Sequence, residues 1–109
     1  MRINPRELRH KIEVQREIDG TDKENRPVPK WTTILKIKSK VINVGGEELE
    51  IANGVGVKFA KTFYIRFRRS IEIKESDRIL YKGKQYNIRY INDIEEKGRY
   101  LEIKTEYIE

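Results

Sequence analysis

The sequence has no cysteine and a single histidine among its 109 residues. The lack of cysteine excludes a disulfide framework, a zinc–thiolate site and a cysteine nucleophile, and one histidine rules out most other metal constellations. No apolar run approaches the ~18 residues that a membrane-spanning helix needs. The first residues also lack the apolar stretch of a signal peptide. We therefore expect a soluble protein that is cytoplasmic when synthesised and has no membrane partner.

Catalytic motifs are also missing. The chain has no GxSxG, no HExxH and no glycine-rich phosphate loop followed by a helix. His10 falls at the start of an expected strand, where a surface or structural role is the ordinary one. The carboxylate pairs Glu47–Glu48 and Glu95–Glu96 fall in expected loops. Because no nucleophile has a base beside it, we expect no enzyme, no catalytic residue, no cofactor and no metal site.

Charge is abundant. Charged residues make up 39% of the chain, and 24 basic against 18 acidic residues give a net charge of +6. Such an excess is compatible with a nucleic acid, an acidic protein partner, or solubility alone. The two signs are interspersed rather than blocked, which weakens the nucleic-acid interpretation.

The most strongly patterned stretch is Phe59–Arg69, FAKTFYIRFRR. Side chains alternate between the faces of a strand, so Phe59, Phe63, Ile65 and Phe67 share one apolar face while Tyr64, Arg66 and Arg68 lie on the other. No Gly or Pro interrupts the run. We therefore expect one long strand that reaches roughly 36 Å.

The remaining segments also predict strands. Asn4, Pro5 and Glu7 are typical of a helix start, here of one or two turns. Strands are expected over residues 10–18, from Trp31 onward, over 78–82, from Tyr86 to a bulge near Ile91, and over 101–107. Between the first two, residues 19–30 predict a polar loop, and hairpin turns are expected at 83–84 and 95–98.

In the strand from Trp31, Leu35, Ile37 and Val41 are expected to share the tryptophan's face. Lys36, Lys38 and Lys40 form a ladder opposite, a common way to keep an exposed strand from aggregating. The pattern predicts an all-β fold: one domain over residues 1–109, a small antiparallel β-barrel or sandwich of about six strands. Its expected core is Ile12, Val14, Leu35, Ile37, Phe63, Ile65, Phe67, Ile79, Ile88, Leu101 and Ile103.

One alternative function follows from the residues themselves. Small barrels bind single-stranded nucleic acid by stacking bases on exposed aromatic rings in a basic groove. Tyr64, Arg66 and Arg68, with Tyr81, Tyr86 or Tyr90 nearby, are candidates for such a surface. Tyrosines are equally expected as ordinary strand formers with hydrated hydroxyls.

The order of several segments resembles the phage head–tail joining family, the head-completion, stopper or head–tail adaptor proteins of siphophages and prophages. The likeness spans residues 8–107 and is carried by LRHKIEVQ from Leu8, Trp31, GEEL from Gly46, FYIRFRRSI from Phe63, DRILYKGKQYNI from Asp77 and GRYLEI from Gly98. The resemblance implies a barrel protomer that forms a ring beneath the portal and joins the DNA-filled head to the tail. It implies portal or adaptor and tail-completion proteins as partners, and duplex DNA passing without sequence-specific binding. The expected location is the virion neck, after synthesis in the host cytoplasm.

In stopper members of the family a loop helps close the DNA channel, and in this chain the segment between Gly45 and Lys58 is the candidate. We expect it to start helically and to form a short helix or an ordered loop. Family members often have a continuous helix here, which Asn53–Gly56 interrupts. The segment is long, as functional connections often are, and its glycines allow it to rearrange on assembly. The glutamates at its start would repel DNA phosphate. The candidate channel or assembly residues are Gly45, Gly46, Glu47, Glu48, Glu50, Asn53, Gly54, Val55 and Gly56.

Overall fold

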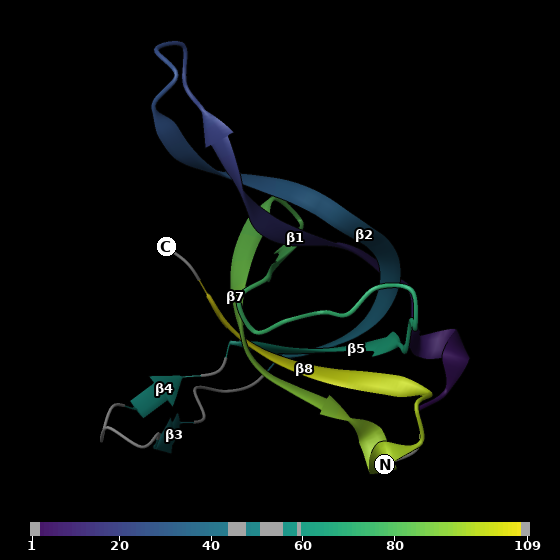
Figure 1. Ribbon diagram of the computed structural model, residues 1–109. Coiled ribbons are helices and arrows are strands. Elements are labelled where there is room, and N and C mark those ends of the chain that lie inside the picture. Colours follow the sequence, from purple (N-terminus) through teal and green to yellow (C-terminus); the bar gives the residue numbers. More distant parts are fainter. Residues whose placement is uncertain (1–2, 44–47, 51–55, 59, 108–109) are drawn as a thin grey trace.

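The computed structural model describes residues 3–43, 48–50, 56–58 and 60–107. Six antiparallel strands close into a barrel in the order β1-β2-β5-β8-β7-β6, as Figure 1 shows. This closure confirms the all-β expectation and selects the barrel over the sandwich. The barrel strands are β1 (His10–Thr21), β2 (Pro27–Asn43), β5 (Lys61–Arg66), β6 (Arg78–Tyr81), β7 (Lys84–Asp93) and β8 (Tyr100–Tyr107).

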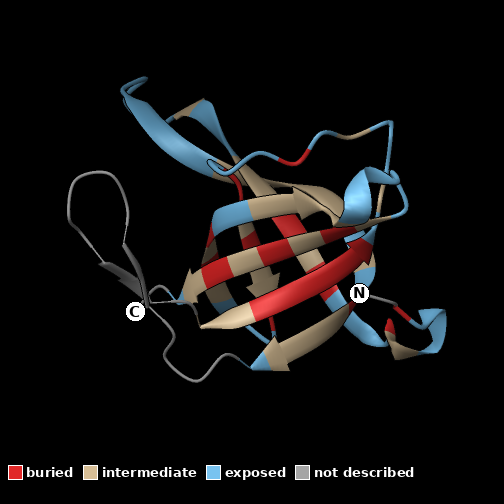
Figure 2. Cartoon of the chain, turned by 90° about the horizontal axis from the view of Figure 1, so that it is seen from below, coloured by how far each residue is buried: buried red, intermediate tan, exposed pale blue. Residues whose placement is uncertain are grey.

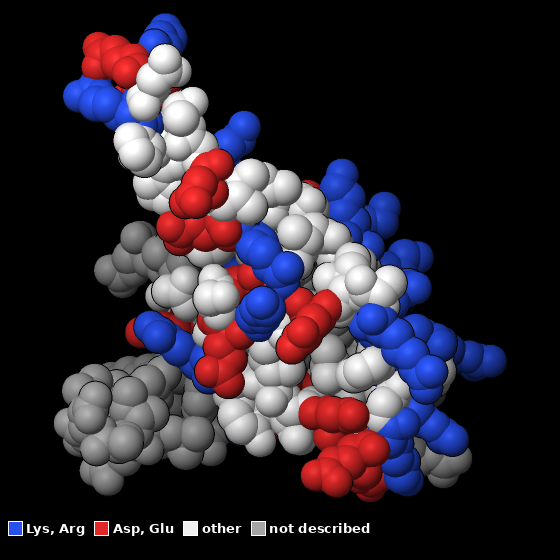
Figure 3. Space-filling model, viewed as in Figure 1, with Lys and Arg blue, Asp and Glu red and all other residues white. Residues whose placement is uncertain are grey.

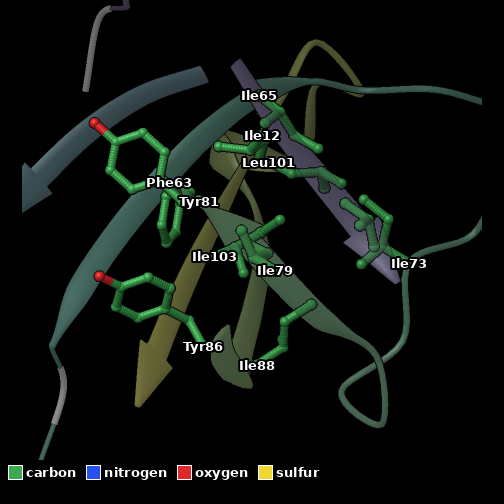
Figure 4. Packing of buried hydrophobic residues seen from close by; sticks show 11 residues of the cluster. Ile12, Phe63, Ile65, Ile73, Ile79, Tyr81, Tyr86, Ile88, Leu101 and Ile103 are labelled. Carbon is green, nitrogen blue, oxygen red and sulfur yellow. The ribbon is translucent and has the colours of Figure 1, made fainter. Parts of the chain in front are cut away.

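The buried barrel core consists of inward side chains from β1, β5, β6, β7 and β8 together with Ile73 (Figure 4), and partly buried residues of β2 pack against it. Phe63 lies at one end of this core, and its ring meets those of Tyr81 and Tyr86 edge-on at centroid distances of 5.7 Å. Eight of the expected core residues are buried: Ile12, Val14, Phe63, Ile65, Ile79, Ile88, Leu101 and Ile103. The other three, Leu35, Ile37 and Phe67, are only partly buried and pack against the margin of the core.

The expected long strand from residue 59 to 69 is wrong in length, because β5 spans only Lys61–Arg66. Phe67 still donates its backbone N–H to Arg99 O at 2.9 Å, but the chain turns away at the exposed Arg68 and Arg69. The long strand of the barrel is instead the 17-residue β2.

The expected alternation of β5 is confirmed, because Phe63 and Ile65 lie in the barrel core while Tyr64 belongs to a separate cluster. The outer face is nevertheless buried at Thr62 and Tyr64. The N-terminal segment covers the outer face, where Ile3 and Leu8 pack against Tyr64 in a second apolar cluster. Figure 2 shows the buried residues along the barrel strands. Burial on both faces explains why an alternating pattern did not predict the surface here.

The N-terminal segment begins with the expected short helix, a single 3-10 turn at η1 (Pro5–Glu7). Asn4 caps it by accepting a hydrogen bond from the backbone N–H of Arg6 at 3.0 Å. Proline at the first position fits because the N–H that it lacks would have no partner there.

The polar loop expected over residues 19–30 is wrong at both ends, because β1 continues to Thr21 and β2 starts at Pro27. The two strands stay paired along this stretch, from Glu17 opposite Trp31 to Thr21 opposite Pro27. Strands tolerate proline at an edge, where no ladder hydrogen bond is lost. We call residues 17–31 the arm. Figure 1 shows it projecting away from the barrel.

The expectation that Trp31 shares a face with Leu35 is wrong, because the pairing of β1 with β2 contains a register shift. Val14 pairs with Leu35, but Gln15 pairs with Thr33, so Ile34 is an extra residue in β2. A bulge of this kind moves the following side chains to the opposite face. Trp31 therefore lies on the outer face, and the guanidinium of Arg78 stacks on its ring at 4.1 Å.

Both hairpin turns expected near the C-terminal strands are present, and the first lies at Lys82–Gly83, one residue before its expected position. Lys82 and Gly83 both have positive φ angles, 50° and 75°, as a two-residue type I′ turn between β6 and β7 requires. The next turn contains η2 (Ile94–Glu96), and Asp93 accepts hydrogen bonds from the Gly98 N–H. The expected bulge in β7 lies between Ile88 and Tyr90.

The helical start expected between residues 47 and 58 is wrong in the described part of this segment. β3 (Glu48–Glu50) and β4 (Gly56–Lys58) form an antiparallel pair of their own, with Leu49 opposite Val57. The sequence contains the corresponding signal, because an Asn-Gly dipeptide (Asn53–Gly54) between short runs favours a hairpin over a helix. In the described residues no helix is long and apolar enough to cross a bilayer.

Candidate functional site

The candidate channel segment is only partly described. Glu48, Glu50 and Gly56 lie in the β3–β4 pair. The other candidates lie outside the described residues: Gly45, Gly46, Glu47, Asn53, Gly54 and Val55. Their expected role in a channel therefore stays a prediction from the sequence.

A groove of about 670 Å³ runs over the outer surface of the barrel near η1. It receives side chains from β1, β2 and β6, from the end of β5, and from the turns that follow β5 and β6. Figure 3 shows Lys and Arg gathered on this side of the molecule, around the curve of β2 and η1. We call it the basic groove, and it is lined by Pro5, Leu8, Lys11, Ile12, Glu13, Lys36, Ile37, Lys38, Arg66, Arg68, Leu80, Lys82 and Gly83.

The register of the sheet explains how these cations meet. Lys11 lies directly opposite Lys38, and Glu13 lies opposite both Lys36 on β2 and Leu80 on β6. These side chains alternate with the inward residues Ile12 and Val14, so they point outward. Residues distant in the sequence thus form one surface.

Most of the groove's cations have no acidic partner. Within the described part of the chain, Lys11, Lys36, Lys38, Arg66 and Arg68 make no ion pair within 4.0 Å. Elsewhere in the described residues Arg16, Arg26, Lys40, Arg89 and Lys97 do have carboxylate partners. On the neighbouring outer surface of β2, for example, Lys40 Nζ lies 2.7 Å from a carboxylate oxygen of Glu7. The groove therefore gathers several cations that have no carboxylate partner.

The sequence contained part of this signal. The lysine ladder of β2 is present, with Lys36 and Lys38 exposed and Lys40 half-buried. Its interpretation as a plain anti-aggregation device missed Lys11, Arg66 and the other cations, which only the closed barrel brings beside it.

The tyrosines do not form the base-stacking surface that the nucleic-acid alternative requires. Tyr64, Tyr81 and Tyr86 are all buried, and of the four candidates only Tyr90 is exposed, at 42%. The hydroxyl of Tyr64 donates to a carboxylate oxygen of Glu102 at 2.8 Å. Burial first, and then this hydrogen bond, raise the pKa of Tyr64 well above its ordinary value. Three of the four proposed stacking rings are therefore structural.

His10 has a structural contact and no catalytic neighbourhood in the described part of the chain. Its Nδ1 lies 3.2 Å from the hydroxyl of Tyr81, and the two rings meet edge-on. The described residues also contain no group of three or more His, Asp or Glu side chains that could hold a metal ion.

The tip of the arm is built around Asp22. Its carboxylate accepts hydrogen bonds from the backbone N–H groups of Glu24 at 2.8 Å and Arg26 at 2.9 Å, and from the Arg26 guanidinium at 3.0 Å. Hydrogen bonds to the charged form favour it, so the Arg26 backbone contact above all holds the pKa of Asp22 below its usual value.

The sides of the arm differ in polarity. Ile18 and Val28 are both exposed, at 43% and 38%. They lie on the same face of the hairpin, because Ile18 pairs with Lys30 and Gly20 pairs with Val28. An ordered projection with exposed apolar side chains is suited to contact with another protein surface.

These features define a class: a small closed β-barrel with a projecting arm and a cationic groove. The family model for the phage head completion protein matches residues 3–107, and the chain belongs to this family. The family has a structural role in the phage head and is not a family of enzymes. The resemblance drawn from the sequence is thereby confirmed.

Solved structures show the same fold. A chain from the virion of a native gene transfer agent particle is similar with a TM-score of 0.64 and 17% identity, over 98% of both chains. The solution structure of a protein from Shigella flexneri 2a is similar with a TM-score of 0.67 and 22% identity, over 96% of both chains. No curated protein matches the chain.

Proposed function

We propose that the chain is a structural protein of the virion neck, which joins the DNA-filled head to the tail as part of a ring around the DNA channel. The observation that carries the proposal is the match to the head completion family over residues 3–107. A structural neighbour that comes from a virion particle supports the same location. Its partners are then portal or adaptor proteins on one side and a tail-completion protein on the other, with synthesis in the host cytoplasm before assembly.

The arm supports a joining role. Arg78 on β6 stacks on Trp31 at the base of the arm, and Asp22 orders its tip, so the arm is a preformed extension. Preformed elements lose little conformational entropy when they bind. We assign the arm, through Ile18 and Val28, to a contact with the neighbouring subunit of the ring.

The test is complementation of a gene deletion in the phage that encodes the chain. The variant Ile18→Asp with Val28→Asp removes the exposed apolar pair without touching the core, so the protein should stay folded. Particles made with it should have unattached tails or should lose their DNA, as seen by electron microscopy.

The matched control changes the other face of the same arm. Glu17 and Thr21 are both exposed, and the variant Glu17→Ser with Thr21→Ser should give normal particles. If the wild-type gene is dispensable for filled, tailed and infectious particles, the proposed neck function is wrong. If the control variant gives the same defective particles as the apolar variant, the contact is not specific to the face that carries Ile18 and Val28.

We further propose that the acidic segment over residues 45–56 lies beside the DNA channel, where its glutamates repel passing phosphate. Shortening residues 51–56 should leave the barrel folded, because β3 and β4 pair with each other and not with the barrel strands. Filled, tailed and infectious virions made with the shortened protein would refute this role.

A further inference from the structure

The net charge of the chain is concentrated on one surface. Six cations and one carboxylate line the basic groove, and the whole chain has a net charge of +6. The groove thus accounts for most of the excess, and the rest of the protein is nearly neutral. A general need for solubility would not place the charge in a single groove.

The arrangement is unfavourable in the isolated protein. Lys11 and Lys38 are directly opposite each other on neighbouring strands, and like charges in this position repel. Neither has an ion-pair partner among the described residues. An anionic ligand would relieve this repulsion.

The apolar residues of the groove indicate which anion. Leu8 and Leu80 contribute apolar lining between the cations, and among the described lining residues none is aromatic. The phosphate groups of a duplex gain nothing from apolar side chains, and single-stranded nucleic acid needs rings on which to stack. An acidic protein segment with interspersed apolar residues matches both features.

We propose that the basic groove is a docking site for an acidic segment of another protein, with apolar residues interspersed. The acidic residues of this segment contact Lys11, Lys38 and Arg66. Its apolar residues contact Leu8 and Leu80. The identity of that protein as a member of the virion neck rests on the proposed function. The chemistry of the groove does not depend on it.

The test is a binding measurement with the isolated full chain. The probe is a fluorescent capped peptide of twelve residues in which glutamate alternates with leucine, and anisotropy is read at 150 mM salt. A second peptide has serine in place of leucine, and a duplex DNA of twenty base pairs is the third probe. We expect the glutamate–leucine peptide to bind at least tenfold more tightly than either of the others.

The groove variant is Lys38→Glu with Arg66→Glu, and the control is Lys23→Glu with Lys30→Glu on the arm. All four residues are exposed, and both variants change the net charge equally. The groove variant should bind the glutamate–leucine peptide at least tenfold more weakly, while the control should bind it as the wild type does. Circular dichroism melting curves establish that both variants are folded. If the charge-reversal variant of the groove is unfolded, the milder double variant Lys38→Gln with Arg66→Gln is used in its place.

Four results would overturn the proposal: no binding by the wild type, equal binding of the serine peptide, tighter binding of the duplex, or equal losses in the groove and arm variants. The last would show a diffuse charge effect. These results concern the isolated protein, whereas the proposed neck function is judged by particle assembly. Either can therefore fail without the other.

Discussion

Arg16 on β1 and Asp77, just before β6, form a two-point ion pair at the place where the barrel closes. Nε and one terminal nitrogen of the guanidinium each donate to a carboxylate oxygen at 2.9 Å. The Asp77 side chain is fully buried, whereas that of Arg16 is 34% exposed. The hydrogen bond to Asp77 raises the pKa of Arg16, against the effect of desolvation.

The unequal burial of the pair predicts unequal effects of mutation. Arg16→Met leaves a buried carboxylate without its partner and should destabilise the protein by about 3–5 kcal/mol. Asp77→Asn leaves a partly hydrated arginine and an amide that still accepts from the Lys74 N–H, so it should cost only about 1.5–3 kcal/mol. Urea unfolding of both variants measures the difference. Equal costs, or a larger cost for Asp77→Asn, would contradict this account.

Phe63 and Phe67 test the packing of β5. Phe63 is fully buried, so Phe63→Ala should cost about 3–5 kcal/mol. Phe67 lies at the margin of the core, and Phe67→Ala should cost clearly less. Thermal melts of the two variants provide the comparison. If Phe67→Ala is the more damaging change, the structure has the order of burial reversed.

The tip of the arm should respond to acid. The pKa of Asp22 is lowered in the folded protein. The stabilisation of the arm tip by the charged Asp22 carboxylate is therefore fully present above the ordinary aspartate pKa of about 4. This contribution is lost as the pH falls through the lower folded value. An NMR titration should show the amide signals of Glu24 and Arg26 moving together below about pH 4. In Asp22→Asn this step should be absent, and its persistence would assign it to another group.

The purified protein should be a monomer or only weakly self-associated. Large exposed apolar side chains in the described residues are scattered, with Ile18 and Val28 on the arm and Tyr90 and Tyr107 on the barrel. A permanent ring needs a larger and more continuous apolar interface. Light scattering over a range of concentrations measures the mass, and a stable ring at low micromolar concentration would disprove the prediction.

The sequence predicted the barrel because its inward residues alternate on most strands. Ile12 and Val14 in β1, or Leu101 and Ile103 in β8, need no information beyond their own strand. The prediction failed where distant segments intervene. Tyr64 is buried because Ile3 and Leu8 cross over it, and no local pattern contains that contact.

The sequence likewise predicted only part of the basic groove. The ladder of Lys36 and Lys38 is visible in one strand, but its neighbours Lys11 and Arg66 lie far away in the sequence. The position of Trp31 depended on an extra residue at Ile34, which alternation alone cannot locate. Strand register and closure, rather than composition, determine which charges meet.

The place of β8 in the barrel has a consequence for synthesis. The strand nearest the C-terminus is not at an edge but is inserted between β5 and β7. A growing polypeptide therefore cannot complete the barrel until residues up to Tyr107 have left the ribosome. A product that stops before Tyr100 lacks the partner of two strands at once, and it should be removed by proteases. If the chain joins a ring, as proposed above, this requirement for a complete β8 would keep prematurely terminated copies out of it.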